Sequence, residues 1–411
     1  MSTVYERLVA EGHLEARVGA GTFVAAVGAS PTRRARRTTL RPRRSWDLRP
    51  HRVSGSEPTP TYDFRVGIPD PTLFPFDTWR RLLAAQVRRG SEPGTYAAPE
   101  GHPALRAAVA RHLAYSRGVQ ADPEDVVATH GTQQALDLVA RVLLEPGDVV
   151  AVEDPGYPFA RDLFASHGAT VVPVPVDDEG LVVDLLPRRC RLVFTTPSHQ
   201  FPLGPPLSLA RRHALLAYAA RHDAAIIEDD YDSEFRFVER PLDPLHRLDE
   251  DGRVVYIGTF SKSLLPSLRA GYLVAPPSLR EALRAARQLT DGYGEPATQL
   301  ALARFIDDGL LARHVRAAAK VYAERRRRVL EGLATLGLEV APSAAGLHLT
   351  AYHHDAVDVA RRARSVGVAL DTLSGYAAGR LARDGLVLGY GATVTESIRP
   401  GIRLLAPLLG S

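Results

Sequence analysis

An alternation of apolar runs with helical segments, which starts near Tyr62, constrains the fold of this chain more than any other feature. Seven runs rich in Val, Ile, Leu and Ala are expected to be strands: residues 125–129, 149–152, 170–176, 191–195, 224–228, 254–258 and 271–274. Strands that are apolar throughout are buried on both faces, so the pattern predicts an α/β fold of three layers around a mostly parallel sheet. Ligands of such folds bind beyond the carboxyl ends of the strands.

The chain divides into four segments by composition and periodicity. Residues 1–27 predict a short amphipathic helix and two short strands about a glycine turn, and residues 28–60 predict a basic linker. Residues 61–298 hold the strand and helix alternation and are expected to form the large domain. Residues 299–411 are helix-rich at first and then give further strand signals, which indicates a smaller α+β domain.

Much of the basic charge is concentrated in one segment. Residues 31–52 contain nine arginines and one aspartate, a local charge of +8 in a chain whose net charge is +4. Proline, threonine and arginine without apolar periodicity are typical of a solvated spacer. A tether that touches DNA or RNA is the alternative, but a run of charge alone is poor grounds for it.

Several classes of protein are excluded by composition. The single cysteine, Cys190, allows neither an internal disulfide nor a cysteine metal cluster, and no metal is expected. The chain starts without an apolar signal sequence, and no apolar run is long enough to cross a bilayer. We therefore expect a cytoplasmic protein that does not enter a membrane.

Lysine is almost absent from this chain. Of 51 basic residues, 49 are arginine, and the two lysines are Lys262 and Lys320. Arginine stays protonated, whereas lysine can lose its proton and act as a nucleophilic amine. Lys320 lies in a charged helical pattern and is expected to face solvent. Lys262 is therefore the candidate for chemistry.

Two candidate binding segments follow predicted strands. Gly131, Thr132 and Gln133 lead from a strand into a helix, where free backbone N–H groups attract an anion, although an ordinary capped helix explains them equally well. Four acidic residues surround Tyr231 after another strand: Glu228, Asp229, Asp230 and Asp232. They could bind a divalent cation, but the sequence shows no second group of histidines and carboxylates. One carboxylate could instead pair with the protonated nitrogen of a pyridine ring.

A third segment adds an amine, two hydroxyls and a guanidinium to the candidate binding groups. Lys262 follows a strand within the run Thr259-Phe260-Ser261-Lys262, and Arg269 lies seven residues later. A lysine for a Schiff base, hydroxyls and an arginine for a phosphate, and a carboxylate for a ring nitrogen together describe a site for pyridoxal 5′-phosphate (PLP).

Residues from about 62 to 411 resemble the fold-type I aminotransferases, specifically the catalytic-like domain of MocR-type regulators in the GntR family. The matching segments, in chain order, are EDPGYP, TPSHQFP, IIEDDYDSEF and GTFSKSLLPSLRAGYLV. The resemblance implies an aspartate aminotransferase-like fold, with a large PLP-binding domain and a smaller C-terminal α+β domain. It also implies a homodimer with shared active sites and a small amine or amino acid as substrate.

The resemblance assigns roles to individual residues. Lys262 would carry PLP as a Schiff base and move a proton between the substrate and the cofactor. Asp229 would pair with the pyridinium nitrogen, and Tyr231 would donate to the phenolic oxygen. Tyr157 would stack on the ring, and Tyr96 would reach the phosphate in the neighbouring subunit. The residues expected around the phosphate are Gly131, Thr132, Gln133, Thr259, Ser261 and Arg269.

The sequence departs from the family in two places. Residues 1–27 resemble only the last helix and the wing of a GntR winged helix-turn-helix, which also needs a full recognition helix. We therefore expect a remnant, and no sequence-specific DNA binding by the chain as written. Aminotransferases also hold the substrate α-carboxylate with an arginine near the C-terminus. Val387 stands at that position, and Arg399 and Arg403 lie further on in a predicted helix.

Two classes of function are consistent with these features. The first is a PLP-dependent, aminotransferase-like transferase that acts through Lys262, with elimination, replacement or carbon–carbon bond formation as further reactions. The alternative is a MocR-type regulator that uses PLP to sense an effector. The basic linker favours the regulator, and the incomplete DNA-binding module favours the enzyme, which is the interpretation we expect.

Overall fold

The computed structural model forms two compact units, residues 1–47 and residues 48–411. It describes residues 2–25, 60–88, 95–237, 242–343 and 345–410, together with Arg41, Arg43 and Trp46. The basic linker predicted over residues 28–60 therefore lies almost wholly outside the described residues.

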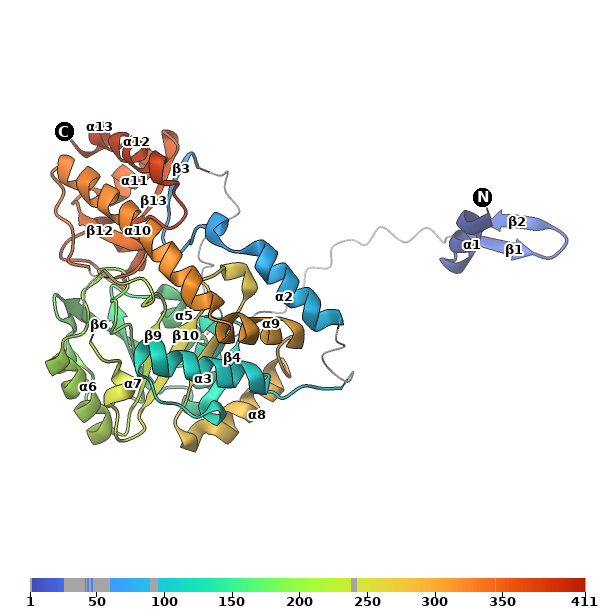
Figure 1. Cartoon of the computed structure of the whole chain (residues 1–411), viewed down its shortest axis with the longest axis horizontal. Coiled ribbons are helices and arrows are strands. Elements are labelled where there is room, and N and C mark those ends of the chain that lie inside the picture. The colour runs from blue at the N-terminus through green and yellow to red at the C-terminus, as the bar shows by residue number, and fades with distance from the viewer. Residues whose placement is uncertain are drawn as a thin grey trace. The chain divides into compact units, whose positions relative to one another are not determined.

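The N-terminal unit is a helix followed by a hairpin (Figure 1). Helix α1 (Ser2–Ala10) precedes strands β1 (Leu14–Arg17) and β2 (Gly21–Val24), which pair antiparallel from Leu14 opposite Val24 to Arg17 opposite Gly21. The predicted helix and two strands are thus present. No residue of this unit that the structure describes is fully buried, so the hairpin has no core of its own.

The main sheet of the larger unit contains eight strands within the described residues. Their order is β4-β11-β10-β9-β8-β5-β6-β7. Neighbours from β10 to β6 are parallel, whereas β11 is antiparallel to both of its neighbours and β7 closes a hairpin with β6. Their bounds are β4 (Val126–Thr129), β5 (Val149–Asp154), β6 (Thr170–Asp177), β7 (Gly180–Leu181), β8 (Leu192–Thr195), β9 (Ala225–Asp230), β10 (Val254–Thr259) and β11 (Gly271–Val274). All seven predicted strands are confirmed, and with them the mostly parallel α/β sheet.

Helices cover both faces of this sheet. One face packs against α4 (Thr132–Leu143), α5 (Pro158–Ser166) and α8 (Arg280–Thr290). The other packs against α2 (Phe76–Arg88), α3 (Pro103–Arg117), α6 (Leu209–His222), α7 (Leu245–Leu248) and α9 (Pro296–Asp307). Successive strand residues point to opposite faces. On β8, Leu192 and Phe194 therefore join the core under α4, and Val193 joins the core under α6.

A second sheet of four described strands has the order β12-β14-β13-β3. Its bounds are β3 (Tyr62–Phe64), β12 (His348–Tyr352), β13 (Val368–Thr372) and β14 (Gly385–Gly389). The helices around it are α10 (Leu310–Thr335), α11 (Ala356–Ser365), α12 (Ile398–Arg403) and α13 (Ala406–Leu409). Helix α10 runs from beside α9 toward this sheet (Figure 1).

The two sheets divide the chain differently from the segments predicted at residues 61–298 and 299–411. Strand β3 pairs in parallel with β13, because Phe64 is fully buried in the core of the second sheet. Helix α9 packs instead on α2 and α3, so the change from one core to the other falls within α10. A three-residue strand has too little periodicity to reveal its partner. None of the described helices combines the length and the apolar character that crossing a membrane requires.

Candidate active site

The predicted site residues gather where the main sheet ends. Strands β4, β5, β8, β9 and β10 are mutually parallel, so their carboxyl ends meet at one edge. The loops that follow them carry Gly131, Tyr157, His199, Tyr231 and Lys262. The structure thereby brings together residues that the sequence separates widely.

Lys262 lies in the loop after β10 and is half-buried. Its Nζ donates a hydrogen bond to the carbonyl of Gly67 at 2.8 Å. Burial lowers the pKa of the Lys262 ammonium below its usual range, although the carboxylates of Asp232 and Asp229 act in the opposite direction. A lowered pKa increases the share of neutral amine, which is the nucleophilic form.

Asp229 is a buried carboxylate on β9 with one oxygen unsatisfied. Its side chain lies opposite Ile257 in the register, and Oδ1 has no hydrogen-bond partner among the described residues. Burial, together with the charge of Asp230, raises the pKa of Asp229 to about 8. Burying an unpaired carboxylate costs free energy, so we expect this oxygen to pair with a cationic group from outside the polypeptide.

The other acidic residues of the cluster are occupied elsewhere. Glu228 accepts backbone N–H groups at the start of α7, at 3.0 and 2.9 Å. Asp230 accepts from Arg117 Nε at 2.6 Å and from the hydroxyl of Tyr256. The cluster therefore does not converge on one cation, and Asp229 differs from its neighbours in lacking a partner for one oxygen.

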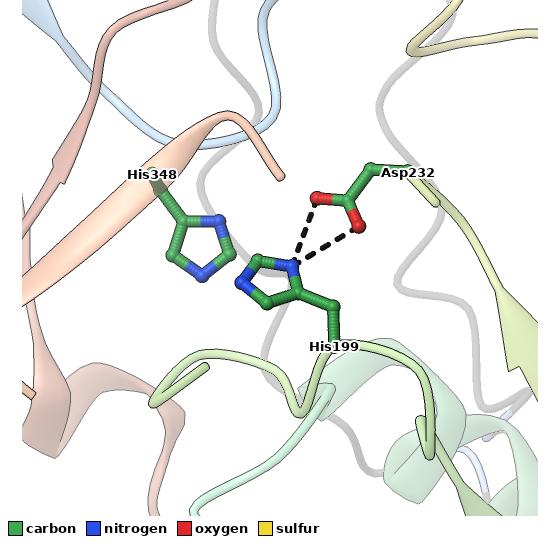
Figure 2. Close-up of side chains that lie close together, drawn as sticks. All are labelled: His199, Asp232 and His348. Carbon is green, nitrogen blue, oxygen red and sulfur yellow. Dashed lines mark hydrogen bonds and ion pairs between the residues drawn. The ribbon is translucent and has the colours of Figure 1, made fainter. Parts of the chain in front are cut away.

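Asp232 takes part in a cluster with His199 and His348 (Figure 2). The expectation that the chain has no group of histidines and carboxylates is wrong, because the fold brings together a histidine that follows β8 and one that begins β12. Ligand atoms of the three residues lie within 4.8 Å of one another. His199 Nδ1 lies 3.0 Å from Asp232 Oδ1, and His348 Nε2 lies 3.1 Å from the carbonyl of Pro202. These atoms are thus already engaged within the protein.

The two predicted tyrosines both pack against Phe201. The Tyr157 and Tyr231 rings have centroids 6.1 and 5.8 Å from the Phe201 ring, both nearly perpendicular to it. The Tyr157 hydroxyl accepts a hydrogen bond from Gln133 Nε2 at 3.2 Å, and burial raises the pKa of Tyr157 to about 12. The Tyr231 hydroxyl lies 2.9 Å from His199 Nδ1. Burial and the nearby Asp232 charge hold the pKa of Tyr231 well above its usual value.

The predicted phosphate-binding residues lie around the start of α4. Gly131 has φ +82°, and a β-carbon there would stand 3.3 Å from the Arg269 guanidinium, so glycine keeps this approach open. Thr132 and Gln133 open the helix, whose first N–H groups and dipole favour an anion. Thr259 Oγ1 donates to Ser261 Oγ at 3.0 Å on the neighbouring loop. Strands β4, β11 and β10 hold these loops side by side.

Tyr96 stands apart from the other predicted residues. It is 91% exposed, and its ring lies 6.0 Å from that of Tyr293. The prediction that it reaches a neighbouring subunit stays a prediction.

The position expected to carry a substrate-binding arginine is apolar. Val387 is fully buried in β14, between Thr350 and Asp371 of the adjacent strands. Arg399 pairs on the surface with Glu331 at 3.1 Å, and Arg403 is exposed. Neither arginine replaces the side chain at position 387.

Sequence reasoning missed three buried residues that hold the loop after β8. Glu153 accepts hydrogen bonds from the Thr195 and Thr196 hydroxyls at 2.5 and 2.6 Å, and burial raises the pKa of Glu153. Gln200 Nε2 donates to the Pro155 carbonyl at 2.9 Å. His199 precedes it and contacts Tyr231. The segment TPSHQFP was recognised as a motif, so His199 and Gln200 could have been singled out as the polar residues of that loop.

Comparisons with known proteins agree with this geometry. Residues 67–371 match the family Aminotransferase class I and II. The probable rhizopine catabolism regulatory protein MocR of Rhizobium meliloti is 38% identical over 98% of this chain and 84% of its own length. Aromatic-amino-acid aminotransferase 1 of Thermococcus litoralis is 30% identical over 83% of this chain and 86% of its own length.

A solved structure extends the similarity to three dimensions. The crystal structure of Pyrococcus horikoshii kynurenine aminotransferase in complex with PMP has a TM-score of 0.78 and 30% identity, covering 85% of this chain and 90% of that chain. The amine of Lys262, the unpartnered oxygen of Asp229 and the anion cradle at Gly131 are the donor set that a pyridoxal phosphate requires. The chain therefore belongs to the aminotransferase class I and II family, with its aspartate aminotransferase-like fold, and to the MocR type within it.

Proposed function

We propose that this protein is a PLP-dependent enzyme that transfers the amino group of a small amine or amino acid. The observation that carries the proposal is the buried, unpartnered oxygen of Asp229 beside the low-pKa amine of Lys262. PLP, when bound, supplies an electron sink for the negative charge that develops at the substrate carbon. Asp229 would hold the ring nitrogen in its protonated form, and so maintain that sink.

Lys262 would hold the cofactor covalently and then act as a base. Once a substrate amine has displaced it, Nζ would accept the proton from the substrate carbon and return it at another position. A base works best when its pKa lies near the working pH, which the burial of Lys262 favours. Tyr157 would cover one face of the ring, and Tyr231 would donate to the phenolic oxygen.

The phosphate would sit at the start of α4, held by Gly131, Thr132, Gln133, Thr259, Ser261 and Arg269. We expect Arg269→Ala to weaken PLP binding by about 10–100-fold, because one charge-assisted hydrogen bond contributes about 1.5–3 kcal/mol. Titration of the cofactor-free protein, followed by the visible absorbance of bound PLP, measures this. Arg399→Ala is the matched control, since Arg399 pairs with Glu331 on the surface. Equal affinities of the two variants for PLP would show that Arg269 does not hold the phosphate.

Transamination is the default reaction. The residue at position 387 bears on which substrates the protein accepts. The buried valine replaces the expected carboxylate clamp, so an ordinary α-amino acid would lose its bidentate partner. Elimination, replacement or carbon–carbon bond formation begins with the same displacement at Lys262. Mass spectrometry of products from a panel of amines, amino acids and keto acids distinguishes these reactions. Absence of turnover with every donor, in a protein that binds PLP, would contradict the enzyme proposal.

The proposal includes a homodimer in which Tyr96 of one subunit reaches the phosphate of the other. We expect Lys262→Ala and Tyr96→Ala each to be inactive or weak as homodimers. When the two are unfolded and refolded together, hybrid dimers should regain activity, since one of their two sites carries neither substitution. Each variant refolded alone is the control. If the mixture stays as inactive as its components, each subunit has its own complete site.

A PLP-sensing regulator is the second candidate. The observation that favours it is the N-terminal unit, a helix and a hairpin, together with regulators such as MocR among the relatives. Under this hypothesis the protein would bind PLP and an amine effector without releasing product. Isothermal titration with amines that bind but are not converted, combined with a DNA-binding assay of the full chain, tests it. Rapid conversion of the amine without any DNA binding would reject the regulator.

A further inference from the structure

A buried network joins Tyr231 to the loop after β8 and to the chain before β12. His199 Nδ1 lies 2.9 Å from the Tyr231 hydroxyl and 3.0 and 3.1 Å from the two carboxylate oxygens of Asp232. Nε2 of the same ring lies 3.1 Å from Ser343 Oγ. His199 and Asp232 are 2% and 1% exposed, so water does not compete for these contacts. Figure 2 shows Nδ1 directed at the carboxylate.

The partners of His199 determine where its protons lie. Ser343 Oγ also lies 3.1 Å from the carbonyl of Ala345, which can only accept. The Ser343 hydroxyl can therefore donate to Ala345 while its oxygen faces Nε2. A carboxylate likewise only accepts, so Nδ1, which faces Asp232, carries a proton. This one N–H is shared between the Asp232 carboxylate and the Tyr231 oxygen, which lie 3.0 and 2.9 Å from Nδ1.

We infer that His199 is a positioning residue for Tyr231: its Nδ1–H donates to the tyrosine oxygen and leaves the tyrosine proton to be donated to the phenolic oxygen of PLP. This inference rests on the proposed function. A hydroxyl that accepts one hydrogen bond becomes a stronger donor in the next. Asp232 holds the ring in place through contacts of its two carboxylate oxygens with Nδ1.

The backbone at Gly346 packs closely against His199 and Asp232 and so restricts their movement. Gly346 has φ +82°, and a β-carbon there would stand 2.1 Å from His199 Cε1 and 2.4 Å from Asp232 Oδ2. Only glycine lets the backbone close over the pair. His348 lies 4.9 Å away, centroid to centroid, and its Nε2 faces the Pro202 carbonyl. Burial and the proximity of His199 hold the pKa of His348 well below its usual value.

Nitrogen-15 NMR of the cofactor-free protein tests the proton positions without any cofactor. The His199 signals are assigned as those that disappear in His199→Asn. We expect Nδ1 of His199 to carry a proton. A non-protonated Nδ1, whether it accepts from Tyr231 or binds a metal ion, would overturn the inference.

A pH titration of the visible band of the PLP-loaded protein tests the effect on the cofactor. Donation to the phenolic oxygen favours its deprotonated form, so His199→Phe should raise the midpoint by about 0.5–1 pH unit, the equivalent of part of one hydrogen bond. His199→Asn, whose amide can donate in place of Nδ1, should restore most of the shift. The ionisable groups that act on Tyr231 are Glu153, Asp229, Asp230 and Asp232. Asp232 and His348 face His199, and Lys262 acts on His348.

A double-mutant cycle separates positioning from a structural role. Tyr231→Phe should raise the midpoint further, and adding His199→Phe to it should change nothing, because His199 acts through the hydroxyl. His213→Gln, at an exposed histidine on α6, is the matched control and should leave the midpoint unchanged. Additive shifts of the two substitutions would overturn the inference. If the wild-type protein takes up no PLP, the proposed function fails, while the NMR measurement still decides the protonation of His199.

Discussion

Lys262→Ala should abolish the visible absorbance of lysine-linked PLP and lower turnover by at least about 10²–10⁴-fold, the contribution of a positioned acid–base group alone. The variant should still bind PLP through the phosphate and ring contacts, because Asp229 and the start of α4 are untouched. Spectra of the variant with added PLP, and single-turnover assays with an amine, measure the two effects. Full turnover in Lys262→Ala would refute the role of this residue.

The second lysine of the chain provides a control substitution for Lys262→Ala. Lys320 is the one other lysine of the 411 residues, and it is exposed on α10. Lys320→Ala should leave the visible band and the turnover unchanged. A similar loss in both variants would point to damage of the fold, because Lys320 is exposed on α10 and has no role in the predicted site.

Asp229→Asn should reduce turnover by about 10²–10³-fold, the effect of removing one preorganised charge. Asparagine cannot hold the ring nitrogen in its protonated form, so the electron sink weakens although the cofactor can stay bound. Rates with a given amine, measured at saturating PLP, report this effect. A normal rate would mean that another carboxylate pairs with the ring.

The same substitution should stabilise the cofactor-free protein. Folding raises the pKa of Asp229 from its ordinary value near 3.8 to about 8, so the unfolded state loses the proton more readily. The contribution of this group to stability is therefore full below about pH 4 and falls as pH rises toward 8. At pH 7 the free energy of unfolding of cofactor-free Asp229→Asn should exceed that of the wild type by about 2–4 kcal/mol.

Asp137→Asn is the control with the opposite sign. Hydrogen bonds from His167 and Arg141 lower the pKa of Asp137, although burial opposes them. This carboxylate therefore stabilises the folded state above its unfolded pKa, and its loss should destabilise the protein at pH 7. Urea unfolding of both variants, without PLP, measures the difference. Destabilisation by Asp229→Asn would show that its carboxylate already has a partner within the polypeptide.

Much of the fold could be predicted from the sequence, because its strands are apolar throughout. Six of the seven runs between residues 125 and 274 are buried along most of their length, whereas β6 is largely exposed or half-buried. Buried apolar runs are recognisable without knowledge of their neighbours. Their order was not predictable, since β11 lies between β4 and β10 and reverses direction. The partner of β3 was not predictable either, because its three residues pair with β13 from the far end of the chain.

The candidate site was predictable where one residue stood out by chemistry. Lys262 did so because the chain otherwise uses arginine. The pairing of His199 with Asp232 was not predictable, since it depends on how the loops after β8 and β9 meet. The acidic cluster shows the same limit: four neighbouring carboxylates look alike in sequence, but the strand directs Asp229 and Asp230 to opposite faces of the sheet.

Borohydride reduction of the PLP-loaded protein, followed by digestion with trypsin and mass spectrometry, tests the central claim most directly. Reduction fixes the cofactor to whichever amine holds it, and the peptide between Arg253 and Arg269 contains Lys262 as its one lysine. The account predicts one phosphopyridoxyl group per chain, on Lys262. An unmodified Lys262, or modification of Lys320 to the same extent, would contradict it.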